Sequence, residues 1–127
     1  MQTFKIAALA TVLACLAVPA LAEGDPAKGE KVFRKCKSCH AVGEGAKNKI
    51  GPLLNGIIDA EIASVEGFKY SKAFLEKKAE GVTWNEESLD AYLTKPKDFI
   101  TGTKMSFAGL RKEKDREDVI AYLRSFE

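Results

Sequence analysis

The chain has 127 residues, of which 46% are hydrophobic and 30% are charged, and its formal net charge is +2. These values are typical of one globular domain, and ten glycines and four prolines are too few for a collagen-like or disordered chain. Because the balance is near neutral and no basic run with interleaved aromatic residues occurs, the sequence gives no indication of nucleic-acid binding.

The N-terminal segment differs sharply in composition from the rest of the chain. Lys5 is its only charged residue, and an apolar run over 6–22 ends in small residues at positions 20 and 22. A basic start, an apolar centre and a small-x-small site are the parts of a secretory signal peptide. We therefore expect a cleaved signal peptide over 1–22, a single domain over 23–127, and a location in the periplasm.

Two other interpretations of this segment stay open. An uncleaved membrane anchor is one, although 17 residues that include Pro19 are short for a span. A lipoprotein cut at Cys15 is the other, although the apolar stretch before that cysteine is short.

The first helix of the domain is predicted from Asp25 and Pro26 to about Lys35, because aspartate is a good N-cap and proline fits the first helical position. From His40 to Phe68 the sequence predicts loop, since glycines and Pro52 interrupt it and no apolar periodicity appears.

Three more helices are predicted in the second half of the chain. Ser71 caps one that runs through Lys78 and is closed by Gly81, and Asn85 caps another that ends at Lys95-Pro96. The last, from about Lys114 to Phe126, has acids first and an arginine near its end, which suits the helix dipole. No convincing strand appears, so the fold class is a small all-α domain with an unusually long loop, which some other group must organise.

The sequence Cys36-Lys37-Ser38-Cys39-His40 supplies such a group. In C-x-x-C-H the two thiols, one helical turn apart, attach haem through thioethers, and the adjacent imidazole binds the iron. A closed zinc site would need a second cysteine or histidine pair, which residues 23–127 lack. A thioredoxin-like pair would need βαβ surroundings, and a disulfide across so short a loop would be strained.

The second axial ligand decides what such a haem could do. His40 is the only histidine of the chain, so a second imidazole is excluded, and Met105 is the only methionine after Met1. A lone methionine often only fills a core, but Met105 lies in a glycine-bracketed loop between helices. We expect Met105 to be the ligand, as His/Met ligation is associated with cytochromes c; Lys104 or an open iron are the alternatives.

Taken together, these motifs resemble a known family. The resemblance covers residues 24–123 and is carried by seven segments in order: CKSCH (36–40), GPLLNG (51–56), GFKYS (67–71), TW (83–84), YLTKPK (92–97), GTKMSFAG (102–109) and REDVIAYL (116–123). The chain resembles the class I c-type cytochromes of the cytochrome c2 family, which are similar to the mitochondrial carrier. The resemblance implies a single domain wrapped around one covalent haem c, with its N- and C-terminal helices crossing through Gly29, Phe33, Val119 and Tyr122.

The resemblance also implies roles for residues around the ligands. The Pro52 carbonyl should accept a hydrogen bond from His40, and Tyr92 and Thr103 should lie close to Met105. Tyr70 and Trp84 should donate hydrogen bonds to a haem propionate, although both could instead be ordinary aromatic core.

Two positions depart from the family pattern. The family often has an arginine shortly after the segment that starts at Gly51, where this chain has Gly56-Ile57-Ile58-Asp59-Ala60, and this puts neutralisation of a propionate in doubt. Thr101 replaces the proline usual before Gly102, and this could loosen the ligand loop.

The function expected is electron transfer rather than catalysis. With both axial positions filled, the iron has no site for oxygen or peroxide, and a thioether ligand places its potential in the positive part of the haem range. The resemblance implies a soluble carrier that takes electrons from a cytochrome bc1-type complex and delivers them to a photosynthetic reaction centre or a terminal oxidase. A small haem enzyme or gas-binding protein with an open sixth site, or a membrane-tethered carrier, are the alternatives.

Charge is distributed unevenly along the chain. Residues 34–49 and 95–112, which contain the ligands, carry a net charge of +8, and the rest of 23–127 carries −7. We expect a monomer that docks on acidic partner surfaces through the basic side chains Lys35, Lys49, Lys97, Lys104, Arg111 and Lys112. A solvated surface without specific function is the alternative.

Overall fold

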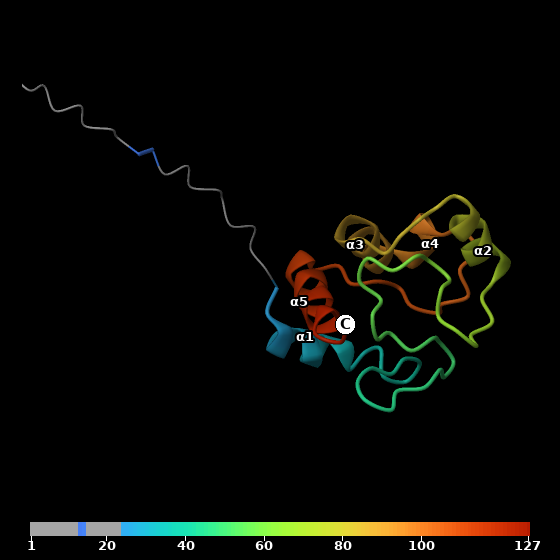
Figure 1. Cartoon of the computed structure of the whole chain (residues 1–127), viewed down its shortest axis with the longest axis horizontal. Helices are drawn as coiled ribbons and strands as arrows, with labels where there is room; N and C mark the ends of the chain where they lie inside the picture. The colour runs from blue at the N-terminus through green and yellow to red at the C-terminus, as the bar shows by residue number, and fades with distance from the viewer. Residues whose placement is uncertain (1–12, 15–23) are drawn as a thin grey trace, which may run out of the picture.

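The computed structural model describes residues 13–14 and 24–127, and within them it contains five helices and no strand (Figure 1). The helices are α1 (Pro26–Phe33), α2 (Lys72–Ala79), α3 (Glu86–Thr94), α4 (Pro96–Phe99) and α5 (Glu113–Arg124). The all-α prediction is therefore confirmed for this part of the chain. No helix in it is long and apolar enough to span a bilayer, and the expected signal peptide lies almost wholly outside the described residues.

Three helices begin directly after the capping residues from which their starts were predicted. The Asp25 carboxylate accepts from the backbone N–H groups of Ala27 and Lys28, and Pro26 occupies the first helical position. Ser71 and Asn85 likewise accept from the backbone N–H group three residues on. Each cap satisfies donors that the first turn of a helix leaves unpaired, so the start of a helix is decided locally.

The helix ends differ from the prediction by one or two residues, and one helix was missed. α1 stops at Phe33 rather than Lys35, because the chain tightens into the turns that carry the cysteines. α5 stops at Arg124 rather than Phe126, and α2 extends to Ala79. α4 was not predicted: Pro96 ends α3, but it also starts a new four-residue helix as its first residue.

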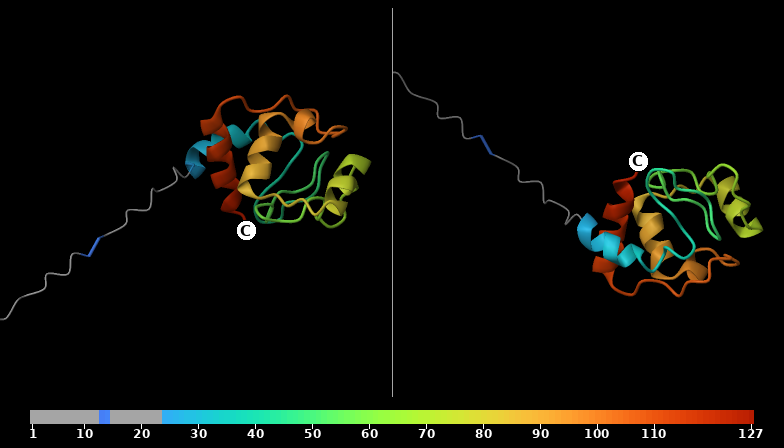
Figure 2. Two further views of the ribbon diagram at one scale, coloured as in Figure 1. Left: turned by 90° about the horizontal axis from the view of Figure 1, so that it is seen from above. Right: turned by 90° about the horizontal axis from the view of Figure 1, so that it is seen from below.

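The first and last helices cross at one end of the molecule, with α2 at the other end (Figures 1 and 2). Gly29 lies so close to α5 that a Cβ atom there would collide with the Asp118 carbonyl group and with Tyr122. Phe33 and Val119 are 1% and 2% exposed, and the rings of Phe33 and Tyr122 are 5.4 Å apart. The predicted crossing and the four residues that form it are confirmed.

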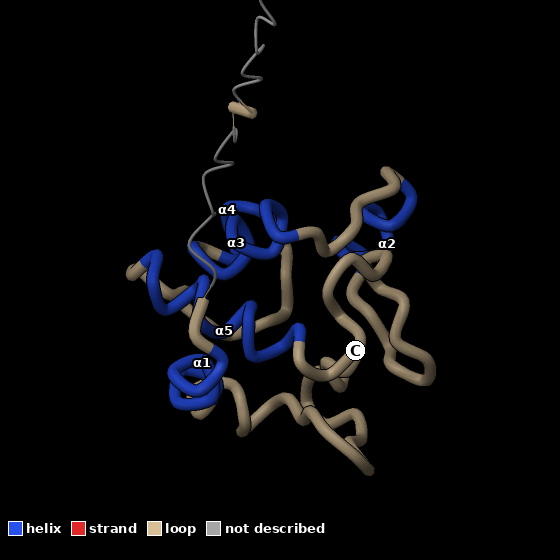
Figure 3. Tube along the Cα trace, turned by 60° about the vertical axis from the view of Figure 1, so that its left-hand side comes forward, coloured by secondary structure: helices blue, strands red, loops and turns tan. Residues whose placement is uncertain are grey.

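The segment from His40 to Phe68 has no regular helix or strand, as predicted, and Figure 3 shows it as continuous loop. Backbone hydrogen bonds to distant segments hold it: Gly56 donates to the Phe126 carbonyl at 2.7 Å and Asp59 to the Trp84 carbonyl at 2.8 Å. A single isolated bridge, between Glu61 and Thr83, adds to them. The loop thus depends on contacts that are remote in sequence.

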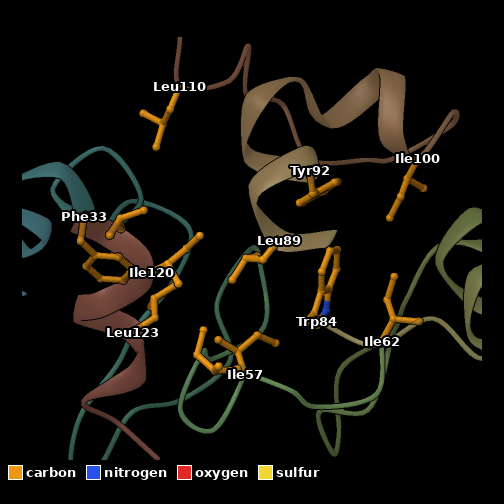
Figure 4. Close-up of a cluster of buried hydrophobic side chains, with 12 residues drawn as sticks. Phe33, Ile57, Ile62, Trp84, Leu89, Tyr92, Ile100, Leu110, Ile120 and Leu123 are labelled. Atoms are coloured by element: carbon orange, nitrogen blue, oxygen red, sulfur yellow. The ribbon is translucent and has the colours of Figure 1, made fainter. Parts of the chain in front are cut away.

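The buried side chains form one hydrophobic cluster, in which Figure 4 shows two groups joined by a few residues between them. One group comes from α1, α5 and the segment before α5, and includes Phe33, Leu110, Ile120 and Leu123. The other lies around α3, and includes Trp84, Tyr92 and Ile100. Ile57 and Leu89 lie between the two groups.

Candidate haem site

A cavity of about 360 Å³ lies within the helical domain. Its volume is in the range typical of small-molecule and cofactor sites. All nine site residues expected from the sequence line it: Cys36, Cys39, His40, Pro52, Tyr70, Trp84, Tyr92, Thr103 and Met105. Much of the remaining wall is apolar and comes from Phe33, Leu54, Phe68, Phe74, Leu89, Leu93, Val119 and Leu123.

The two cysteines and the histidine share one tight turn after α1. Cys39 and His40 both donate backbone hydrogen bonds to the Cys36 carbonyl, at 3.1 and 2.9 Å. Both thiols are free and half-buried. Burial raises the pKa of Cys36, an effect that nearby Lys35 partly offsets. The turn therefore holds two adjacent thiols and an imidazole on the wall of one cavity.

The imidazole of His40 is oriented by the backbone. Its Nδ1 atom lies 2.6 Å from the Pro52 carbonyl oxygen, and because a carbonyl can only accept, Nδ1 carries the proton. Burial lowers the pKa of His40, against the opposing effect of this hydrogen bond, so the neutral ring is favoured. The other nitrogen, Nε2, then has a free lone pair, which is the state in which histidine binds a metal.

Met105 belongs to a loop, residues 101–109, that we call the Met105 loop. The backbone N–H group of Met105 donates to Thr103 Oγ1 at 3.3 Å, and that oxygen lies 2.9 Å from the Tyr92 hydroxyl. Tyr92, in turn, is a buried residue of α3. The structure therefore brings Tyr92 and Thr103 next to Met105 and ties the loop to a helix.

Tyr70 and Trp84 carry polar groups into an otherwise apolar wall. The Tyr70 hydroxyl accepts from the Val65 N–H group at 3.0 Å, and its own proton remains available to an acceptor. Trp84 is 5% exposed, and its indole also lines the cavity. Buried tyrosine and tryptophan usually have a hydrogen-bond partner, so the cavity suits a ligand that carries acceptors.

The donor set fits haem c. Two thiols one turn apart can form thioethers, the free imidazole nitrogen and the thioether can bind iron, and the apolar wall suits a porphyrin. Among residues 13–14 and 24–127 no group of three histidine, cysteine, aspartate or glutamate side chains is arranged to hold a metal ion by itself.

The structure shows the surroundings of the two positions that depart from the family pattern. Ala60 lines a second cavity, of about 300 Å³, and among residues 13–14 and 24–127 the one charged side chain in its wall is that of Glu66. The start of the Met105 loop is fixed without proline, since Ile100 is fully buried and its carbonyl accepts from the Thr103 N–H group at 3.1 Å.

Of the basic residues expected to dock a partner, two line the cavity itself. Lys35 and Lys104 are exposed and contribute to its wall from separate segments. The others are exposed but do not line the cavity: Lys49, Lys97, Arg111 and Lys112. Ile50 is 80% exposed and also contributes to the wall.

Two residues near the site, Arg116 and Asp90, were not found from the sequence. Arg116 is 9% exposed and its Nε atom donates to Asp90 Oδ1 at 2.6 Å, which links α5 to α3. One signal could have found it: Arg116 precedes Val119 and Ile120 by three and four residues, so it lies on the apolar stripe of its helix.

Comparison with known proteins decides the family. The cytochrome c family model matches residues 26–127. The chain belongs to the cytochrome c family. It is 55% identical to cytochrome c-550 of Ancylobacter novellus over 101 residues, which are 80% of this chain and 94% of that relative. It is 47% identical to cytochrome c2 of Rhodomicrobium vannielii, with 97% and 95% covered.

Solved structures agree with the family assignment. The structure of cytochrome c2 from Rhodospirillum centenum matches with a TM-score of 0.77 and 43% identity, over 81% of this chain and 98% of that one. This cytochrome therefore has the class I fold. The family carries one haem c bound covalently through a cysteine pair, here Cys36 and Cys39, and its members are electron-transfer proteins rather than enzymes.

Proposed function

We propose that this cytochrome is a soluble periplasmic one-electron carrier whose haem iron is bound by His40 and Met105. The observation that carries the proposal is that both residues line one cavity and each is held by its own neighbours. Pro52 fixes the imidazole, and Thr103, next to Tyr92, fixes the backbone of Met105. Lys104, the alternative ligand, is an exposed residue.

The bound haem supplies a ferric/ferrous one-electron couple. The protein controls this couple through its own groups. The thioether of Met105 favours the ferrous state, and burial in an apolar wall disfavours the extra charge of the ferric state. We therefore expect a potential in the positive part of the haem range. Tyr70 and Trp84, which line the cavity, would donate hydrogen bonds to a propionate.

The periplasmic location rests on the signal peptide expected over 1–22. Contacts with α5 begin shortly after that segment, since the backbone N–H group of Asp25 donates to the Asp118 carboxylate at 2.7 Å. A Cβ atom at Gly24 would collide with the Glu117 carbonyl, so the chain is already packed on α5 there. Cleavage after residue 22 would therefore keep the residues that pack on α5.

For partners we propose a cytochrome bc1-type complex as electron donor and a photosynthetic reaction centre or terminal oxidase as acceptor. Relatives with similarity over most of their length are named cytochrome c2. The docking face would centre on Lys35 and Lys104 at the cavity, and the carrier would act as a monomer. A face of positive charge steers an acidic partner to the part of the surface where the cofactor is closest.

The test of the ligation is Met105→Ala in the haem-loaded protein. We expect the potential to fall, because the ligand that favours ferrous iron is lost, and we expect cyanide to bind the ferric form readily. The neighbouring change Ser106→Ala serves as control, since Ser106 is exposed in the same loop. The measurements are a redox titration and the ferric absorption spectrum.

Either of two results would contradict the proposal. One is a Met105→Ala protein with unchanged potential and cyanide affinity. The other is a wild-type ferric spectrum that is high-spin, which would favour the enzyme or gas-binding alternative instead.

A further inference from the structure

The Met105 loop is attached to α3 at both of its ends. At the first end, Thr103 pairs with Tyr92 at 2.9 Å. At the second end, the Leu110 N–H group donates to the Leu93 carbonyl at 2.7 Å, and a Cβ atom at Gly109 would collide with the Thr94 carbonyl.

Between these ends the side chains of Met105 and Phe107 pack against the core, but the backbone makes few hydrogen bonds of its own. Of the backbone N–H groups from Lys104 to Gly109, that of Met105 alone makes a hydrogen bond within the described chain, to Thr103 Oγ1. The position of Met105 therefore depends on how firmly the two ends are held.

Arg116 holds the second end. Its Nη1 atom donates to the carbonyl oxygens of Leu110 and Arg111, at 2.9 and 3.2 Å, directly after the Met105 loop. Its Nε atom donates to Asp90 on α3 at 2.6 Å. One buried guanidinium thus joins α5, α3 and the end of the loop in a single network, and such networks are strongly coupled.

We propose that Arg116 and Asp90 form a positioning pair that keeps Met105 at the cavity. The pair would set how often the loop opens while the helices stay folded. This inference rests on the proposed ligation by Met105. Neither residue lines the cavity, so the pair acts through the loop and not by contact with the haem.

The experiment measures imidazole binding to the ferric, haem-loaded protein by stopped flow, because imidazole can bind only when Met105 leaves. Arg116→Lys keeps the charge but loses the planar guanidinium, which donates to Asp90 from one nitrogen and to the two carbonyls from another. Asp90→Ala removes the carboxylate, and its side chain is 40% exposed, so the fold should tolerate the change. We expect each to raise the binding rate about tenfold, which corresponds to about 1.4 kcal/mol. Asp90→Glu should stay within about threefold of wild type.

The matched control is Asp118→Asn, which weakens the contact of α5 with Asp25 and the pair with Lys114 inside α5, but no contact with the Met105 loop. It should lower the free energy of unfolding in guanidinium and leave the imidazole rate unchanged. Equal acceleration in Asp118→Asn and the Arg116 and Asp90 variants would overturn the proposal, and so would a wild-type rate in Asp90→Ala. If Arg116→Lys does not fold, the two Asp90 variants decide.

Met105→Ala separates this proposal from the ligation on which it rests. If Met105→Ala and wild type bind imidazole at the same rate, the ligation is wrong. If they differ and the Asp90 and Arg116 variants match wild type, the ligation stands and the positioning role is wrong.

Discussion

At the residue scale, Gly51 and Gly81 are needed for different physical reasons. A Cβ atom at Gly51 would collide with Cε1 of the His40 ring, so the backbone can pass the imidazole only without a side chain. Gly81 follows α2 with φ of +79°, a conformation that side chains disfavour, but a Cβ atom there would meet nothing within 4 Å. One position is therefore limited by space and the other by backbone conformation.

This difference predicts distinct outcomes for two alanine variants of the haem-loaded protein. Gly51→Ala should cost about 1–3 kcal/mol of unfolding free energy, as overpacking does, and should change the haem absorption spectrum because the ring must move. Gly81→Ala should cost about 1–2 kcal/mol and leave the spectrum unchanged. Guanidinium titrations and spectra check both. A smaller loss in Gly81→Asn is the control, because asparagine tolerates positive φ; an unchanged spectrum in Gly51→Ala would contradict the contact.

At the scale of the elements, the starts of the helices could be predicted and the course of the long loop could not. A cap is decided within three residues, so Asp25, Ser71 and Asn85 were sufficient. The loop from His40 to Phe68 is held by partners as remote as Phe126, and nothing local indicates them. α4 was missed for a related reason, since Pro96 ends one helix and begins another.

In the site, too, residues with a local signal could be predicted from the sequence and residues that depend on remote partners could not. The residues with distinctive chemistry, the two cysteines, His40 and Met105, were found from the sequence, and the structure places them at one cavity. The Arg116–Asp90 pair was not found, because residues 26 positions apart carry no mutual signal in one sequence. Its hydrogen bonds to the carbonyls of Leu110 and Arg111 involve backbone atoms, which every residue has.

Where α1 meets α5, Asp118 accepts from the Asp25 N–H group and from the Lys114 ammonium and is 2% exposed. Burial raises the pKa of Asp118, but these hydrogen bonds and the charges of Lys114 and Lys28 outweigh it, so its pKa lies below the ordinary value. The carboxylate therefore contributes stability above the unfolded pKa, about 3.9, and this contribution is lost as pH falls through the lower folded value.

We expect Asp118→Asn to cost about 1–3 kcal/mol at pH 7, because a charged hydrogen-bonding partner is lost from a buried position. The difference from wild type should start to shrink below about pH 4, where the unfolded carboxylate takes up a proton, and should be smallest below the lower pKa of the folded protein, where the folded carboxylate is protonated too. Guanidinium titrations of both proteins across this range measure it. A difference that stays constant down to the lowest pH would show that the carboxylate charge is not what stabilises the contact.

At the scale of the whole molecule, positive charge is concentrated in the segments that contain the expected haem ligands. The stretches that contain the ligands carry a net charge of +8, against −7 for the rest of 23–127. Lys35 and Lys104 bring this charge to the cavity from two segments. Lys72, whose side chain is 91% exposed and does not line the cavity, serves as the reference lysine outside this group.

The charge asymmetry predicts that electron transfer to an acidic partner depends on salt. Steering raises association rates by about 10 to 1,000-fold at low ionic strength and fades as the Debye length falls from about 30 Å at 0.01 M to about 8 Å at 0.15 M. The measurement is the second-order rate constant with a reaction centre or terminal oxidase across that range. Lys35→Glu and Lys104→Glu should lower the rate at low salt and flatten its salt dependence, while Lys72→Glu should behave almost as wild type. Equal salt slopes in all four proteins would exclude steering by this face and leave electron transfer itself untouched.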